Sequence, residues 1–160
     1  MTCLLVRKAV LTDVEAIVDM NCRLAQETEN LVLDPVVVRA GAEQALMLSE
    51  EVSYFVAEMQ QQLVGQLMLT REWSDWRNGW IAWLQSVYVR REFRQQGVFR
   101  SLLNVARTDL SRRTDCRLLR LYVEDNNSDA MQTYARLGFR DANYRVLECR
   151  LFPPPESKGE

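Results

Sequence analysis

The chain has 160 residues, of which 48% are hydrophobic, so it can bury the core of a single domain without help from disulfides or metals. Its formal net charge is -2 at pH 7, and it contains no histidine. The absence of histidine excludes catalysis by a Ser-His or Cys-His pair. The acidic balance argues against a nucleic-acid-binding protein.

The charge is unevenly distributed along the chain. Residues 1–76 hold 5 Lys and Arg against 12 Asp and Glu, whereas residues 90–120 hold 9 Arg against 3 acidic residues. The basic segment suits a ligand with several negative charges, and the acidic half would favour a cationic amine. Ordinary solvated faces are the alternative explanation for both segments, and a nucleic-acid patch is a further alternative for the arginines.

The four cysteines are Cys3, Cys22, Cys116 and Cys149. They lack the close spacing of metal sites and redox motifs, so we expect small buried residues and no bound metal. Charged residues lie close to the only apolar run near the N-terminus, and no apolar stretch approaches the roughly 20 residues that a bilayer requires. We therefore expect a cytoplasmic protein with no membrane partner.

Hydrophobic periodicity and turn residues predict a series of strands and helices. The expected elements of the first half are strand 4–10, helix 14–27 with a capping box at 12–15, helix 35–48, and strands 54–59 and 63–70. Glutamines 60–62 form the turn between the last two strands, and Gly65 marks a bulge.

The second half is expected to begin with a loop that precedes further strands and helices. These elements are loop 71–79, strand 80–89, helix 97–112, strand 117–123, helix 128–137, closing strands 139–141 and 144–152, and a tail at 153–160. Three consecutive prolines open the tail, which cannot continue a strand and is expected to be disordered.

The most informative segment runs from the strand at 80–89 through a short basic loop into the helix at 97–112. The loop reads Arg94-Gln95-Gln96-Gly97, and the helix that follows has one apolar face. The unpaired N–H groups and the positive end of the helix dipole create a site for phosphates beside these basic residues. A nucleotide-like pyrophosphate is the expected ligand.

A second segment, residues 127–139, contains another helix with polar and glycine boundaries. Asn127 or Ser128 can cap its start, and Gly138 can adopt the left-handed conformation at its end. Tyr134 lies on its apolar face with residues 130, 131 and 137.

Both segments resemble signatures of the GNAT N-acetyltransferase superfamily. Arg94 and Gly97 match the acyl-CoA loop, whereas Phe99 stands where a small residue is expected. The matches in the second segment are Asn127, Ala130, Tyr134, Gly138 and Phe139. The resemblance extends over about residues 3–152. It implies an α/β (α+β) fold with a mixed, mostly antiparallel sheet, about four flanking helices and one domain over 1–152.

The resemblance also implies acetyl-CoA as co-substrate. The backbone of Val87, Tyr88 and Val89 would pair with the pantetheine arm. The pyrophosphate would be held by Arg94, Gln95, Gln96, Gly97, Val98, Phe99 and Arg100. Asn127 would contact the cofactor, although a helix cap alone explains it too.

By the same resemblance, Tyr134 also contacts the cofactor and is the general acid for the leaving thiolate, the alternative being a core aromatic residue. Gln85 stands where many members have glutamate, and it cannot accept a proton. The carboxylates left to serve as base or amine contact are Glu27, Glu29, Glu72, Asp75 and Glu124. Trp73 and Trp76 would wall the acceptor pocket, or would cover the sheet edge.

The expected function is direct acetyl transfer, in a ternary complex, from acetyl-CoA to a primary amine of a small molecule. A peptide or protein amine is an alternative acceptor. A non-catalytic acyl-CoA or metabolite sensor on the same fold is the other alternative, because Gln85, Phe99 and the absence of histidine depart from a typical enzyme. Similar proteins often dimerise, and no sequence feature decides between a monomer and a homodimer.

Overall fold

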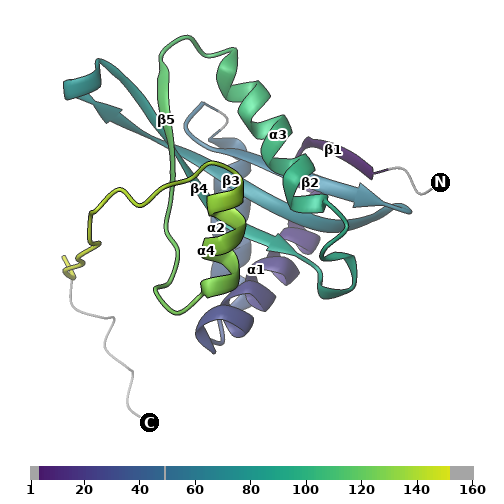
Figure 1. The fold of residues 1–160 in the computed structure, drawn as a ribbon. Coiled ribbons are helices and arrows are strands. Elements are labelled where there is room, and N and C mark those ends of the chain that lie inside the picture. The colour runs from purple at the N-terminus through teal and green to yellow at the C-terminus, as the bar shows by residue number, and fades with distance from the viewer. Residues whose placement is uncertain (1–3, 49, 152–160) are drawn as a thin grey trace. The chain divides into compact units, whose positions relative to one another are not determined.

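The computed structural model describes residues 4–48 and 50–151, and Figure 1 shows its fold. The chain divides into two compact units, Met1–Tyr122 and Val123–Glu160. The expected tail at 153–160 lies outside the described residues, and the single domain stays a prediction. No helix in the described part of the chain is both long enough and apolar enough to cross a membrane.

The first unit is built on a five-stranded sheet with the order β1-β2-β3-β4-β5. The strands are β1 (Leu4–Lys8), β2 (Ser53–Met59), β3 (Gln62–Ser74), β4 (Gly79–Val89) and β5 (Cys116–Leu121). The first four pair antiparallel, and β5 runs parallel to β4. The predicted mixed, mostly antiparallel sheet is confirmed.

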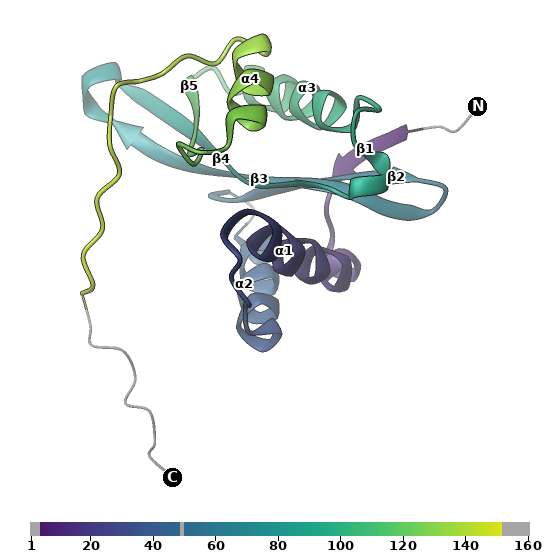
Figure 2. The ribbon, with the colours of Figure 1, turned by 60° about the horizontal axis from the view of Figure 1, so that its bottom comes forward.

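Helices cover both faces of this sheet. They are α1 (Val14–Glu29), α2 (Pro35–Met47) and α3 (Val98–Ser111). Figure 2 shows α1 and α2 on one face and α3 on the other. α3 is the crossover that the parallel pair β4 and β5 requires. Fully buried side chains such as Ile17 and Leu102 lie on the inner sides of α1 and α3.

The start of α1 differs from the expected capping box. A 3₁₀ turn, Leu11–Asp13, precedes the helix, and the buried Asp13 carboxylate accepts a hydrogen bond from the Val10 backbone N–H at 2.8 Å. The same carboxylate pairs with Arg7 on β1 at 2.7 Å. The Arg7 hydrogen bond lowers the pKa of Asp13 despite its burial. Asp13 therefore caps the turn before α1 and ties it to β1, whereas Glu15, the acid of the expected capping box, pairs with Arg39 on α2.

The β2–β3 hairpin confirms the expected turn and bulge. Gln60 and Gln61 adopt φ values of 52° and 62° although neither is glycine. Pairing passes from Ala57 opposite Gly65 to Glu58 opposite residue 63, so β3 carries one extra residue there. A Cβ on Gly65 would lie 3.1 Å from the Tyr88 carbonyl oxygen, which explains the glycine.

Residues 71–79 form strand and turn instead of a loop. β3 continues to Ser74, a 3₁₀ turn spans Asp75–Arg77, and β4 begins at Gly79. Trp73 pairs across the strands with Trp80, with ring centroids 5.2 Å apart in an edge-to-face arrangement. Such aromatic cross-strand pairs stabilise a hairpin and override the polar character of the segment.

The second unit contains α4 (Ser128–Arg136), and its boundaries are as expected. The Asn127 side chain accepts from the Ala130 N–H at 3.1 Å, and Gly138 has a φ of 89°. The expected closing strands are not formed between residues 139 and 151, and residue 152 lies outside the described part. Val146 and Leu147 are 60% and 90% exposed, so this segment lacks the packed face that supports a strand.

Candidate functional site

The second half of β4 is paired on one side only. Its parallel register with β5 ends at Leu84 opposite Leu121, while pairing with β3 continues to Val89 opposite Gly65. Among the described strands, none pairs with the other side of residues 85–89. Backbone groups on that side can therefore bind an extended ligand in the way an added strand would.

A bulge marks the start of this one-sided segment. Gln85 pairs with Met68 and Tyr88 pairs with Gln66, so two residues of β4 lie opposite one residue of β3. One of the two, Ser86, adopts a φ of 50°. Such a conformation costs a non-glycine residue about 1 kcal/mol, and it persists only where the surroundings enforce it.

The basic loop follows β4 directly and leads into α3. A 3₁₀ turn, Arg91–Phe93, begins it, and Gly97 ends it with a φ of 80°. A Cβ on Gly97 would meet no atom within 4 Å, so the loop is open at this point. The first N–H groups of α3 have no acceptor within the helix, and they carry the positive end of its dipole.

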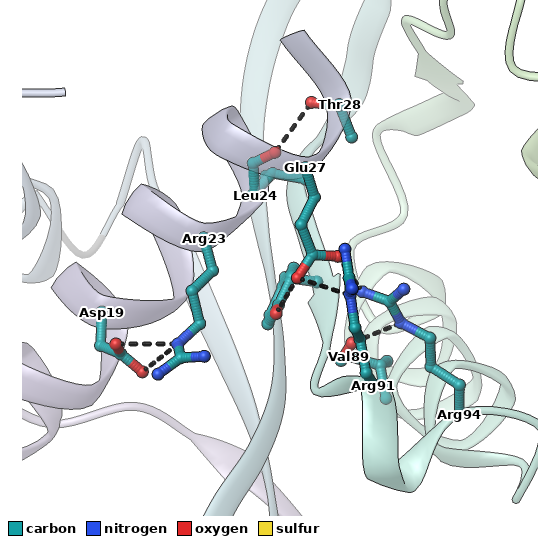
Figure 3. Close-up of polar contacts among 9 residues, drawn as sticks. Asp19, Arg23, Leu24, Glu27, Thr28, Val89, Arg91 and Arg94 are labelled. Atoms are coloured by element: carbon teal, nitrogen blue, oxygen red, sulfur yellow. Dashed lines mark hydrogen bonds and ion pairs between the residues drawn. The ribbon is translucent and has the colours of Figure 1, made fainter. Parts of the chain in front are cut away.

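Glu27, near the end of α1, ties this loop to the helix, and Figure 3 shows it beside Arg91 and Arg94. Glu27 accepts from Arg94 at 2.6 Å and from the Tyr88 hydroxyl at 2.8 Å, and it pairs with Arg91 at 3.2 Å. The Arg94 Nε donates to the Val89 carbonyl at 2.8 Å. Burial opposes ionisation of Glu27, but these hydrogen bonds outweigh it and lower the pKa of Glu27.

The pKa of Tyr88 shifts in the opposite direction from that of Glu27. Its burial, together with its hydrogen bond to Glu27, raises the pKa of Tyr88. Arg94 was expected to contact phosphate, but its guanidinium is already engaged by Glu27 and the β4 backbone. The exposed Arg100, on the first turn of α3, has no ion pair within residues 4–48 and 50–151. Of Arg94 and Arg100, Arg100 is therefore the residue whose charge is not neutralised by an ion pair within these residues.

A buried amide connects α1, β2, β3 and β4. Gln66 is fully buried, and its Nε2 donates to Asn21 Oδ1 at 2.7 Å and to the Ser86 carbonyl at 3.3 Å. Asn21 in turn donates to the Tyr54 hydroxyl at 3.3 Å. This network holds the carbonyl of the strained Ser86. Our sequence analysis missed these four residues; the one available signal was a glutamine between apolar positions of a strand.

An open pocket of about 540 Å³ lies between α1, α2 and strands β2 to β4. Asn21, Tyr54 and Ser86 line it, so the buried network forms part of its wall. Glu29, at the end of α1, also lines it. The volume is within the range of small-molecule sites, which is about 300–1,000 Å³.

The structure brings several expected site residues together and separates others. Glu27, Tyr88, Val89 and Arg94 are in contact, residues 95–100 follow them directly, and Glu29 lines the pocket. Four others lie on the β3–β4 hairpin end: Glu72, Trp73, Asp75 and Trp76. At about 3.3 Å per residue, β4 puts roughly 30 Å between that end and Val89, and Figure 2 shows the hairpin tip and the start of α3 toward opposite ends of the sheet.

The hairpin residues have partners of their own. Glu72 accepts from the Trp83 indole N–H at 2.7 Å and lies 3.8 Å from Arg120. Asp75 accepts from the Trp76 backbone N–H, and Trp76 is 87% exposed. Apart from Arg120 on β5, these partners belong to the hairpin itself, and the contacts favour neither a base nor a pocket wall.

The remaining candidates lie on β4 and in the second unit. Gln85 donates to the hydroxyl of Thr70, which lines the pocket, at 3.0 Å. Glu124 is exposed. Tyr134 is half-buried and meets Phe139 edge to face at 5.6 Å. Burial raises the pKa of Tyr134, so its phenol keeps its proton at neutral pH, as a proton donor must.

Residues 19–139 match the Acetyltransferase (GNAT) family. An uncharacterized N-acetyltransferase of Methanocaldococcus jannaschii is 29% identical over 97 residues, which span 60% of this chain but only 42% of that protein.

Two solved structures extend the comparison to the whole fold. A possible acetyltransferase from Clostridium difficile 630 is 35% identical, with a TM-score of 0.86 over 94% of this chain and 99% of that one. An aminoglycoside N-acetyltransferase in complex with CoA has a TM-score of 0.77 over 95% of this chain and 97% of that one. At 15% identity, the second shows likeness of fold alone.

Proposed function

Because this chain belongs to the acetyltransferase (GNAT) family, we propose that it transfers an acetyl group from acetyl-CoA to the primary amine of a small molecule. The neutral amine nitrogen attacks the thioester carbonyl, so that a C–N bond forms and the C–S bond breaks. The nitrogen loses one proton, and the departing thiolate gains one. No covalent acyl-enzyme is needed, which agrees with a chain that has no histidine to activate a nucleophile.

One observation carries the proposal: the one-sided segment of β4 leads through the basic loop to the open N-terminus of α3. In the bound state, the pantetheine amides would pair with the backbone of Val87–Val89. The pyrophosphate would accept from the N–H groups of residues 95–100, with Arg100 adding charge. Arg94 would act indirectly, because its contacts with Glu27 and Val89 hold the loop in position.

The acceptor amine would enter the pocket that begins at Ser86, beside the proposed pantetheine edge. Glu29 is the carboxylate that lines this pocket among the described residues, so it would attract the ammonium form or take up its proton. Glu27 is less suited to that role, because its hydrogen bonds favour the ionised carboxylate and occupy its oxygens. Tyr134 would protonate the thiolate. The cytoplasmic location stays a prediction.

Calorimetric titration with acetyl-CoA tests the loop. Gly97→Glu adds bulk and negative charge where the pyrophosphate would bind, so we expect its Kd to rise at least about tenfold, or ~1.4 kcal/mol. Gly97→Ala carries the same backbone strain without the charge, and Asn78→Asp places the charge on the distant β3–β4 hairpin end. Both controls should bind more tightly than Gly97→Glu. Equal affinity in all variants would remove the loop from the site.

A further inference from the structure

We propose that the acceptor is a primary amine with an apolar body and no carboxylate, such as an alkylamine or an arylalkylamine. This inference rests on the acetyl transfer proposed above, and it names the chemical class that the pocket between α1, α2 and the sheet selects. Three features of the pocket carry it: its apolar wall, its single charge and a gap in α2.

The wall is predominantly apolar. It includes Leu24, Leu33, Val38, Leu48, Val52 and Met68, which come from α1, α2, the segments flanking α2, and β3. An apolar group of a ligand gains free energy when it leaves water for such a surface. A highly hydrated acceptor with several hydroxyl or ammonium groups would instead lose hydration without gaining partners there.

The charge of the pocket has one sign. None of the described residues that line it is Lys or Arg, and Glu29 is its one ionisable carboxylate. Glu29 is exposed, and within the described residues it has neither a hydrogen bond nor an ion pair. An ammonium is attracted by this carboxylate, whereas the carboxylate of an amino acid would meet like charge and no counter-ion.

The gap in α2 is the space beside Gly41, which has no side chain. Glycine is unfavourable inside a helix, yet this one lies near the middle of α2 and lines the pocket. A Cβ built on Gly41 meets no atom within 4 Å. The missing side chain therefore leaves room that a ligand can use, and a larger residue would occupy that room without a clash with the protein.

The polar end of the pocket gives the ligand a direction. The Tyr54 hydroxyl accepts from Asn21, so its own hydrogen stays available to a further acceptor. Tyr54 and Ser86 lie together on the wall at the β4 bulge, where the proposed acyl-CoA edge begins. The amine would point toward Ser86, and the apolar body would extend past Gly41.

Matched amine pairs test this class, with CoA release and calorimetric binding to the CoA-saturated protein as two readouts. Phenethylamine and phenylalanine differ in the carboxylate alone, and hexylamine and hexamethylenediamine differ by an ammonium at the far end. We expect the first member of each pair to be favoured at least about tenfold. Hexylamine should exceed butylamine about fifteenfold in kcat/KM, at ~0.8 kcal/mol for each of the two extra methylenes.

Two variants with matched controls locate the effect. Gly41→Leu should lower kcat/KM for hexylamine about tenfold and leave ethylamine nearly unchanged, without a loss of thermal stability, because leucine favours the helix. Ala40→Leu, on the same helix and outside the pocket wall, is its control. Glu29→Gln should lower kcat/KM about three- to fivefold, since the proposed ion pair between Glu29 and the ammonium is solvent-exposed. Glu43→Gln is its control.

The two readouts separate the inference from the proposed function. Binding of phenethylamine but not phenylalanine, without CoA release, supports the pocket assignment and counts against acetyl transfer. CoA release that prefers phenylalanine or hexamethylenediamine supports acetyl transfer and overturns the inference. Equal use of hexylamine by Gly41→Leu and by the unmodified chain, or no binding of any apolar amine, also overturns it.

Discussion

Two glutamates on the last turns of α1, Glu27 and Glu29, have different surroundings and therefore suit different roles. Glu27 is held by Arg94, Tyr88 and Arg91, and its pKa is lowered. Glu29 lies two residues later on the pocket wall and has no such partner among the described residues. The sequence offers both as acceptor contacts, and the contacts in the structure favour a positioning role for Glu27.

Glu27→Gln should weaken acetyl-CoA binding about three- to tenfold, because Arg91 and Arg94 lose the charge that fixes the loop. The free energy of unfolding at neutral pH should fall by about 1–2 kcal/mol. The folded pKa of Glu27 lies below the unfolded value of about 4.3, so its stabilisation is present above that pH and is lost as the pH falls through the folded pKa. Urea unfolding across pH measures the effect.

The stability difference between Glu27→Gln and the unmodified chain should therefore shrink in acid. Glu29→Gln is the matched control, with no expected change in unfolding at any of these pH values. A difference that stays constant down to the lowest pH would show that the charge of Glu27 does not stabilise the fold.

Tyr134→Phe tests the proton donor. The change removes the hydroxyl and keeps the ring against Phe139, so we expect turnover to fall about a hundredfold with little change in acetyl-CoA affinity. Because burial raises the pKa of Tyr134, the unmodified enzyme should not lose this proton below about pH 10. Unchanged turnover in the variant would refute the role.

At the scale of elements, β4 serves two purposes along its length. Its first half pairs with β3 and β5, and its second half pairs with β3 alone. The bulge at Ser86 lies where one arrangement gives way to the other, and the buried Gln66 holds it. The first half of β4 is therefore paired on both sides, and the second half leaves backbone groups on one side that a ligand can bind.

Gln66→Leu tests this support. The variant keeps the size of the side chain but removes the donor to Asn21 and Ser86, so we expect kcat/KM for the amine to fall about tenfold. Stability should change by less than about 1.5 kcal/mol, because the unpaired Gln66 Oε1 disappears as well. Gln62→Leu, exposed on β3, is the control. Full activity in Gln66→Leu would mean that the bulge keeps its conformation without the hydrogen bond from Gln66.

Elements with strong local signals were predictable from the sequence. α3 and α4 follow from apolar periodicity and from Gly97, Asn127 and Gly138 at their ends. The Trp73–Trp80 pair that extends the β3–β4 hairpin could not be foreseen, because it depends on a contact across two strands. The expected closing strands failed for a related reason: alternation predicts a strand only where a partner surface exists.

The candidate site was predictable in part. The basic loop and Gly97 indicate a candidate phosphate site from the sequence alone, because these residues are contiguous in the chain. Gln66, Asn21 and Tyr54 come from three separate elements, and only the fold joins them in one hydrogen-bond network. Glu29 was one carboxylate among several until the pocket distinguished it.

At the scale of the whole chain, part of the uneven charge distribution is used inside the first unit. Arg90 pairs with Asp19 at 2.9 Å and Arg94 with Glu27 at 2.6 Å, so the basic segment is bound to the acidic first half. Lys8 on β1 pairs with Asp109 on α3 at 3.0 Å, so here the acidic half supplies the cation and the basic segment supplies the carboxylate. The solvated-face alternative is therefore incomplete, and Arg100 remains available for an anionic ligand.

The most direct test of the central claim is a combined assay of the purified chain with acetyl-CoA and phenethylamine, in which CoA release and the acetylated amine are measured together. We predict that the two products appear in equal amounts and that neither appears when the amine is omitted. Tight binding of acetyl-CoA with no product from any amine would contradict acetyl transfer and favour an acyl-CoA sensor on the same fold.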